Sequence, residues 1–167
     1  MLACSAGEVS EDTVRKVRET YDRLYAEDPL KLVKPYPGIP ALLRLLHSHQ
    51  IKLAVLSNKP DDMTCRVVEG LFGTGLFSHV QGQKEGVPKK PDPTAPRFIL
   101  ETLGAAPEKC LYIGDSGVDM ETGKNASMTT VGATWGFRSR EELLAHGACH
   151  LADSPEQIAQ LVLGTNG

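Results

Sequence analysis

Two aspartates stand four residues apart in the segment GDSGVD at residues 114–119. The segment directly follows Cys110–Ile113, a short apolar run typical of a strand buried on both faces. Carboxylates one helical turn apart can share a hard cation such as Mg²⁺, which prefers oxygen ligands. Asp115 or Ser116 could equally cap the next helix, whose first turn Asp119 would favour through the helix dipole. The residues alone leave both roles open.

A second group with chemical potential is the basic loop KKPDP at residues 89–93. An ammonium held at Lys90 could neutralise a phosphoryl group and stabilise the charge that builds during its transfer. Pro91 restricts the backbone of Lys90 to extended conformations, which helps to aim the side chain. A solvated loop lysine is the alternative interpretation.

A third group, Ser57 and Asn58, follows the apolar run at residues 51–56. A hydroxyl beside the backbone N–H groups of a helix start can bind a phosphate oxygen. Serine and asparagine are also leading helix N-caps, so capping is the simpler reading of this pair by itself.

Apolar runs at 51–56, 110–113 and 129–135 predict buried strands, and residues 77–80 a further short one. Helical patterns are predicted at 10–27, 39–46, 63–71, 96–103 and 118–126, after Ser139, and after Ser154. Strands alternating with helices predict an α/β fold, a Rossmann-like parallel sheet with helices on both faces. Ligands bind beyond the carboxyl ends of such strands. We therefore expect Ser57, Lys90 and Asp115 to converge there.

Length and composition narrow the function classes. The chain of 167 residues suggests one domain, and 18 basic against 21 acidic residues give a net charge of -3. That balance argues against nucleic acid as a partner, and no apolar run is long enough to cross a membrane. Four scattered cysteines fit the reducing cytoplasm. The GxSxG, GxxxxGK[ST] and GxGxxG motifs are absent from the sequence.

In order and spacing these segments resemble the haloacid dehalogenase (HAD) superfamily, and within it the phosphoglycolate phosphatase group. The resemblance rests on PYPG at residues 35–38, KPDP at 90–93, GDSGVD at 114–119 and WGFR at 135–138. It extends from Pro35 to the last predicted helix. It implies a HAD-like Rossmannoid core over residues 35–167 and a remnant of a helical cap over residues 1–34.

The resemblance also implies an activity, the Mg²⁺-dependent hydrolysis of a small phosphate monoester through an aspartyl-phosphate. Carried over by position, Ser57 and Asn58 bind the transferring phosphoryl group. Lys90 pairs with that group and with the nucleophile. Asp115 binds Mg²⁺, and Asp119 is a further ligand, directly or through water.

One motif of the family, DxDx[TV], is missing from the sequence. In the family it supplies the nucleophile from a central strand, between the strands that carry Ser57 and Asp115. Its absence implies a core without its first strand, unpaired edges on both neighbours, and the C-terminal part of a larger protein. We expect little or no phosphatase activity from this chain alone.

The alternatives are a catalytically inactive phosphate-binding or interaction module, and another HAD activity such as a phosphomutase or pyrophosphatase. The GDSGVD segment fits the phosphatases better than the mutases, whose motif usually begins with two acidic residues. Neither the true substrate nor the oligomeric state is indicated by the sequence.

Overall fold

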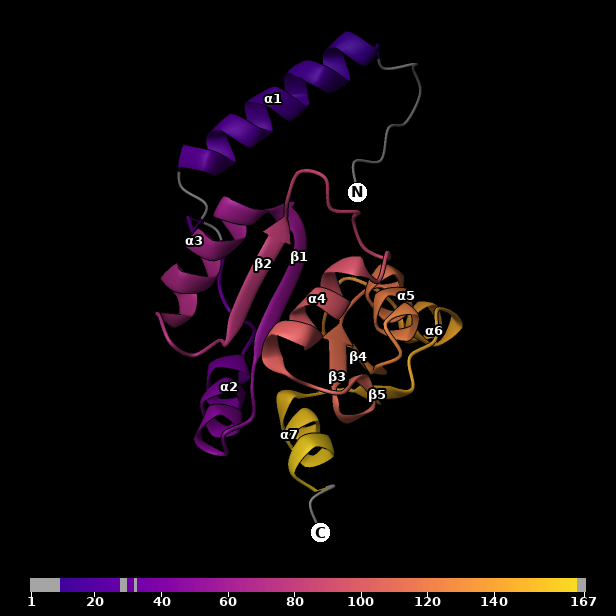
Figure 1. The fold of residues 1–167 in the computed structure, drawn as a ribbon. Helices are drawn as coiled ribbons and strands as arrows, with labels where there is room; N and C mark the ends of the chain where they lie inside the picture. Colours follow the sequence, from indigo (N-terminus) through magenta and orange to yellow (C-terminus); the bar gives the residue numbers. More distant parts are fainter. Residues whose placement is uncertain (1–9, 28–29, 32, 165–167) are drawn as a thin grey trace. The chain divides into compact units, whose positions relative to one another are not determined.

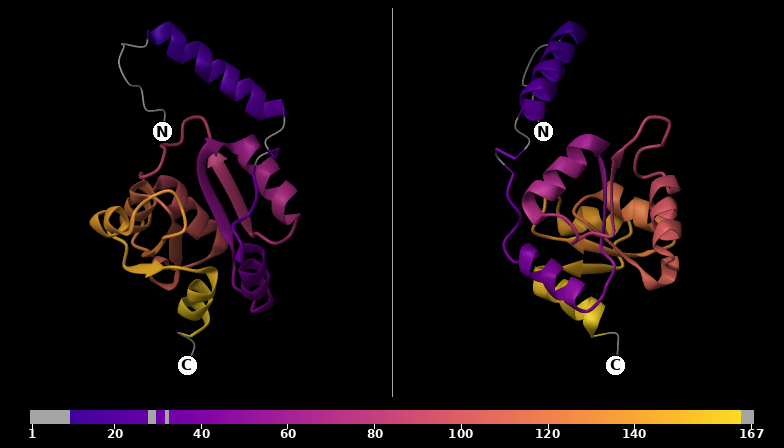
Figure 2. Two further views of the ribbon diagram at one scale, coloured as in Figure 1. Left: turned by 180° about the vertical axis from the view of Figure 1, so that it is seen from behind. Right: turned by 60° about the vertical axis from the view of Figure 1, so that its left-hand side comes forward.

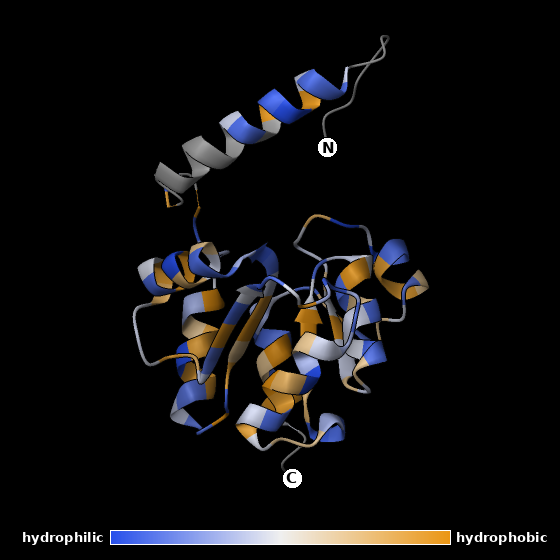
Figure 3. Cartoon of the chain, turned by 45° about the horizontal axis from the view of Figure 1, so that its top comes forward, coloured by the Kyte–Doolittle hydropathy of each residue, from blue (hydrophilic) through white to orange (hydrophobic). Residues whose placement is uncertain are grey.

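The computed structural model describes residues 10–27, 30, 31 and 33–164. By its internal contacts the chain divides into two compact units, one ending at Val33 and the other beginning at Lys34. In the first unit, helix α1 (Glu11–Glu27) forms where the apolar spacing predicts it. Val14 and Val17 on this helix are more than half exposed, and its described part is mostly hydrophilic (Figure 3). The assignment of this unit to a cap remnant stays a prediction.

The second unit alternates strands with helices along the chain (Figure 1). Its strands are β1 (Ala54–Pro60), β2 (His79–Gln83), β3 (Leu111–Gly114), β4 (Thr129–Ala133) and β5 (His150–Ala152). Its helices are α2 (Ile39–Ser48), α3 (Asp61–Phe72), α4 (Thr94–Leu103), α5 (Gly117–Asn125), α6 (Arg140–Ala145) and α7 (Pro155–Leu163), with a short 3₁₀ helix at Pro107–Lys109. The predicted α/β class is confirmed.

All strand pairs are parallel, but the strands form two separate sheets in the described part of the chain. One sheet has the order β1-β2 and the other β3-β4-β5. Helices flank the strands on both sides, with α2 packed against α7 on one side and α4 on the other (Figure 2). The break between β1 and β3 falls where the resemblance places the missing strand.

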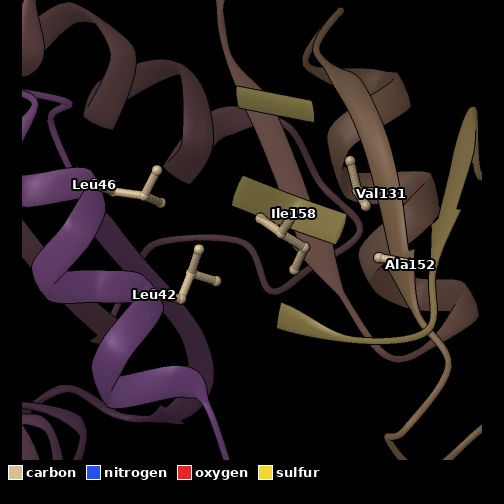
Figure 4. Packing of buried hydrophobic residues seen from close by; sticks show 5 residues of the cluster. All are labelled: Leu42, Leu46, Val131, Ala152 and Ile158. Carbon is tan, nitrogen blue, oxygen red and sulfur yellow. The ribbon is translucent and has the colours of Figure 1, made fainter. Parts of the chain in front are cut away.

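A small apolar cluster joins α2 and α7 to the three-stranded sheet (Figure 4). Leu42 and Leu46 of α2 point toward Ile158 of α7, which also meets Val131 and Ala152 of the sheet. All five side chains are buried. Burying such side chains contributes about 1.5–3 kcal/mol for each large one, so this cluster fixes the helices against the strands.

Several boundaries differ from the predicted ones. The first strand begins at Ala54 and continues to Pro60, so it includes Ser57 and Asn58 instead of ending before them. Its regular pairing with β2 covers Ala54 to Leu56 and is irregular from there to Pro60. No pattern in the sequence predicts β5, because it is three residues long and begins with an exposed histidine.

The predicted helix starts at Ser139 and Ser154 have different outcomes. The hydroxyl of Ser139 accepts the N–H of Glu142 at 3.3 Å and caps α6, as the capping box predicts. Ser154 occupies the N-cap position of α7 with Pro155 after it, but its side chain makes no capping bond. The Gln157 side chain accepts the Asp153 N–H there instead.

Helix α6 provides a matched test of the core. Leu143 is fully buried, whereas its neighbour Leu144 is 55% exposed. We expect Leu143→Ala to lower the free energy of unfolding by about 3 kcal/mol, because it leaves a cavity. Leu144→Ala should change it by no more than about 0.5 kcal/mol. Urea denaturation followed by circular dichroism measures both, and equal effects would contradict the packing described here.

Candidate functional site

The central feature of the candidate site is an ion pair between Lys90 and Asp119. The Lys90 Nζ lies 2.7 Å from Asp119 Oδ1, and the side chains are only 14% and 11% exposed. Lys90 comes from the loop after β2, and Asp119 from the first turn of α5. The ion pair therefore joins two of the three segments that the sequence singles out for chemistry.

Lys90 is held from the side of β1. The Asn58 side chain accepts the backbone N–H of Lys90 at 2.9 Å and donates to its carbonyl at 3.4 Å. The Lys90 ammonium also donates to the backbone carbonyl of Leu56 at 3.5 Å. The Lys90–Pro91 peptide bond is cis, and Asn125 of α5 donates to the Pro91 carbonyl at 2.9 Å. The loop is thus fixed by β1 at Lys90 and by α5 at Pro91.

Asp119 is fixed by its own turn. Ser116, the N-cap of α5, donates its hydroxyl to Asp119 Oδ2 at 2.6 Å, and the Asp115 N–H approaches the same oxygen at 3.3 Å. A Cβ at Gly114 would lie 2.2 Å from the Cβ of Asp119. Glycine is therefore required at the end of β3 for Asp119 to pack against the strand.

The Asp115 side chain is held by the loop that follows β4. Its Oδ2 accepts the backbone N–H of Phe137 at 3.2 Å. A Cβ at Gly136 would lie 2.2 Å from the Cβ of Asp115, so only glycine permits this close approach. The sequence motif WGFR marks this loop, but its contact with Asp115 could not be predicted from spacing.

Tyr112 of β3 lies beside this charged group. Burial raises the pKa of its phenol, and the negative charge of Asp119 raises that pKa further. The phenol therefore stays protonated at neutral pH and adds no negative charge near Lys90. We assign Tyr112 no direct part in the chemistry.

Ser57 lies in the irregular part of β1, next to the Asn58 that holds Lys90. Its hydroxyl accepts the N–H of Lys59 at 3.1 Å, a local bond that leaves its own proton available to an acceptor. The structure thus brings Asn58, Lys90, Asp115 and Asp119 into one bonded network, and it places Ser57 beside that network without a direct bond to Lys90.

The acidic residue closest in sequence to β1 is engaged elsewhere. Asp61 begins α3, and its Oδ1 accepts the N–H of Gly82 at 2.8 Å while Lys84 lies 3.6 Å from its Oδ2. This carboxylate is bound to the end of β2. It therefore does not take the place of a nucleophile between β1 and β3.

The described residues contain no group of three or more His, Cys, Asp or Glu side chains arranged to hold a metal ion. Asp115 and Asp119 provide two carboxylates at the end of one strand, already oriented by Phe137, Ser116 and Lys90. Mg²⁺ keeps several waters and often takes one or two protein carboxylates. The donor set fits Mg²⁺ but supplies only part of a coordination shell.

Comparison with protein families gives a match over residues 4–133 to the haloacid dehalogenase-like hydrolases. A phosphoglycolate phosphatase of Aquifex aeolicus is 40% identical over 119 residues, covering 71% of this chain and 56% of the relative. One from Vibrio vulnificus is 31% identical over 156 residues, 93% of this chain and 68% of the relative. The chain spans little more than half the length of the Aquifex relative.

Solved structures agree with the fold. A protein of Lactobacillus delbrueckii assigned as a phosphoglycolate phosphatase superposes with a TM-score of 0.87 and 37% identity, over 93% of this chain and 65% of its own. A Thermotoga maritima protein assigned as a β-phosphoglucomutase gives 0.73 and 26%, over 96% of this chain and 72% of its own. Similarity in structure therefore extends to both phosphatases and mutases.

The ion pair can be tested by a double-mutant cycle. Removing either partner leaves a poorly solvated charge, so Lys90→Met or Asp119→Asn should each lower the free energy of unfolding by about 3 kcal/mol. We expect a coupling energy of about 1–3 kcal/mol from the double variant. The exposed pair Arg138–Glu142, 3.6 Å apart, should couple by no more than about 0.5 kcal/mol. Equal coupling in the two pairs would contradict the assignment.

Proposed function

The chain belongs to the haloacid dehalogenase-like hydrolase family, and on that basis we propose that it carries most of the site of a Mg²⁺-dependent phosphate-monoester hydrolase. The proposed reaction is of the phosphoglycolate phosphatase type, the conversion of 2-phosphoglycolate to glycolate and phosphate. The phosphatases from Aquifex and Vibrio with which the chain aligns support this substrate class.

The observation that carries the proposal is the fixed cation at the carboxyl ends of β1 and β3. Lys90 is held through its backbone by Asn58 and through its ammonium by Asp119. A phosphoryl group is an anion, and a positioned ammonium stabilises it without reorganising at the moment of reaction. A lysine held in this way fits an anion-binding role better than that of a solvated loop lysine.

Each side chain has a role in this proposal. Lys90 contacts the phosphoryl group with the third N–H of its ammonium, since the other two donate to Asp119 and to the Leu56 carbonyl. Ser57 donates its hydroxyl to a phosphoryl oxygen, and Asn58 adds its backbone N–H while its side chain keeps Lys90 in place. Bound Mg²⁺ would neutralise phosphoryl charge as a Lewis acid, held by Asp115 and by Asp119 directly or through water.

The sequence contains no DxDx[TV] motif, and Asp61 is bound to β2. Nucleophilic catalysis requires a carboxylate within reach of the phosphorus atom. We propose that this chain by itself binds a phosphate group but turns over phosphate monoesters weakly or not at all.

The free thiols of Cys65, Cys110 and Cys149 are consistent with a cytoplasmic setting, which is part of the proposal. In the described residues, no helix is long and apolar enough to span a membrane.

A phosphate-binding experiment tests whether these residues bind phosphate or only stabilise the fold. We expect orthophosphate to bind the chain in the presence of Mg²⁺, and Lys90→Met to weaken binding at least about tenfold, since a charge-assisted hydrogen bond contributes about 1.5–3 kcal/mol. Lys89→Met is the matched control, because Lys89 is an exposed lysine next in sequence. Isothermal titration calorimetry measures both, with circular dichroism to verify folding. Equal loss in the two variants would refute the assignment of Lys90.

Turnover is measured on the same preparations with 2-phosphoglycolate and p-nitrophenyl phosphate. We expect rates no higher than those of Asp115→Ala. Clear Mg²⁺-dependent turnover that is lost in Asp115→Ala would mean that another carboxylate of this chain acts as the nucleophile. Phosphate binding without turnover would agree with our proposal for the isolated chain.

A further inference from the structure

An open hollow of about 400 Å³ lies between α2 and the loop that joins α3 to β2 (Figure 1). Asn58 of the proposed phosphate site lies shortly before the start of α3, whereas the hollow adjoins the last residues of this helix. A helix of twelve residues is about 18 Å long, so the hollow is separate from the phosphate site. Its walls include Pro40, Arg44 and His47 of α2, and Leu71, Phe72 and Leu76 of α3 and the loop.

One wall of the hollow carries two basic side chains. Arg44 and His47 are three residues apart and share one face of α2, whereas Leu42 and Leu46 of the same helix belong to the buried apolar cluster. The guanidinium of an arginine is always charged. Among the described residues, the side chains of Arg44 and His47 have no hydrogen-bond or ion-pair partner. Their N–H groups are therefore free to bind a ligand.

The wall formed by α3 and the loop is apolar and held in place. Leu71, Phe72 and Leu76 are each partly buried. The Phe72 ring meets the Phe77 ring edge to face, with the ring centroids 5.7 Å apart, and such a pair orients both rings. Small-molecule sites usually combine a preformed apolar wall with a few placed polar groups. The hollow has this composition.

A neighbouring hollow indicates the sign of charge that the first one selects. This second hollow, of about 230 Å³, shares Thr74 and Gly75 with the first. It is also lined by apolar side chains, Val68 and Phe77, but it carries Glu69 instead of the two basic groups. A small anion is therefore attracted to the first hollow and repelled from the second.

We propose that the hollow beside Arg44 binds a small organic anion, a monocarboxylate carried on a ring or a short hydrocarbon chain. The guanidinium pairs with both carboxylate oxygens, and the His47 ring adds an N–H, which imidazole has in either protonation state. The hydrocarbon part packs against Phe72 and Leu76. One permanent cation matches one negative charge, so a monocarboxylate suits the hollow better than a dianionic phosphate ester. This binding does not depend on the proposed function.

The probe is 2-naphthoate, and NMR titration of the isotopically labelled full chain measures both its affinity and its location. We expect saturable binding with a Kd of about 1 mM or tighter, with shifts at the amides of Arg44, His47, Gly75 and Leu76. The neutral 2-naphthamide keeps the rings without the charge, and acetate keeps the charge without the rings. Each should bind at least about tenfold more weakly, because it loses either the charged hydrogen bonds or the apolar contact.

Substitutions test the two basic groups separately. Arg44→Gln should weaken 2-naphthoate binding at least about tenfold, whereas Lys109→Gln, which removes an exposed cation elsewhere, should change it little. His47→Gln should also weaken binding. Its control is His49→Gln, because the His49 ring bonds to the Leu45 carbonyl and does not line the hollow. Circular dichroism verifies folding, and orthophosphate binding should be unchanged in Arg44→Gln.

Several results would overturn the inference. Equal affinity for 2-naphthoate and 2-naphthamide would identify an apolar patch without charge selection. Equal losses in Arg44→Gln and Lys109→Gln would identify a general effect of net charge. Competition by orthophosphate, or loss of 2-naphthoate binding in Lys90→Met, would place the probe in the phosphate site. Absence of saturable binding by the folded chain would also refute the proposal, and it would leave the proposed phosphate site untouched.

Discussion

The ion pair between Lys90 and Asp119 is the interaction on which the site depends. It is mostly buried, and each partner is also held by groups from its own side: Asn58 fixes the backbone of Lys90, and Ser116 fixes the carboxylate of Asp119. A shielded ion pair is strong only when such additional bonds satisfy its partners. Here those bonds come from β1 and α5, so the pair also connects the two sheets. It adds to the bonds from Asn58 and Asn125 that hold the loop at residues 84–93.

Much of this arrangement could be predicted from local patterns. Short apolar runs marked the strands that carry Tyr112 and Val131, and the GDSGVD segment placed Asp115 directly after a strand. Parallel strands end at one edge of a sheet, so strand order predicted that Ser57, Lys90 and Asp115 would converge. The ion pair that Lys90 forms with Asp119 was not predicted. The helix start at Ser139 could be predicted from the sequence because its capping bond joins residues only three positions apart. Signals of this kind are local in sequence.

What could not be predicted depends on contacts between distant residues. Asn58 looks like a phosphate ligand or a cap by its type, but its side chain is bonded to the backbone of Lys90, 32 residues away. No sequence feature links Gly136 to Asp115, and the two residues come into contact only in the folded chain. The start of β1 was displaced by three residues because tertiary pairing with β2, and not the apolar run, sets its limits.

The packing of α2 on α7 has a consequence for how the second unit is made. Leu42 and Ile158 belong to the same buried cluster although they come from its two ends. During synthesis α2 leaves the ribosome early, but its apolar partners arrive only after β5 and α7 have been translated. Long-range contacts of this sort close late and slow folding. The apolar face of α2 therefore lacks its buried partners until most of the second unit has been translated.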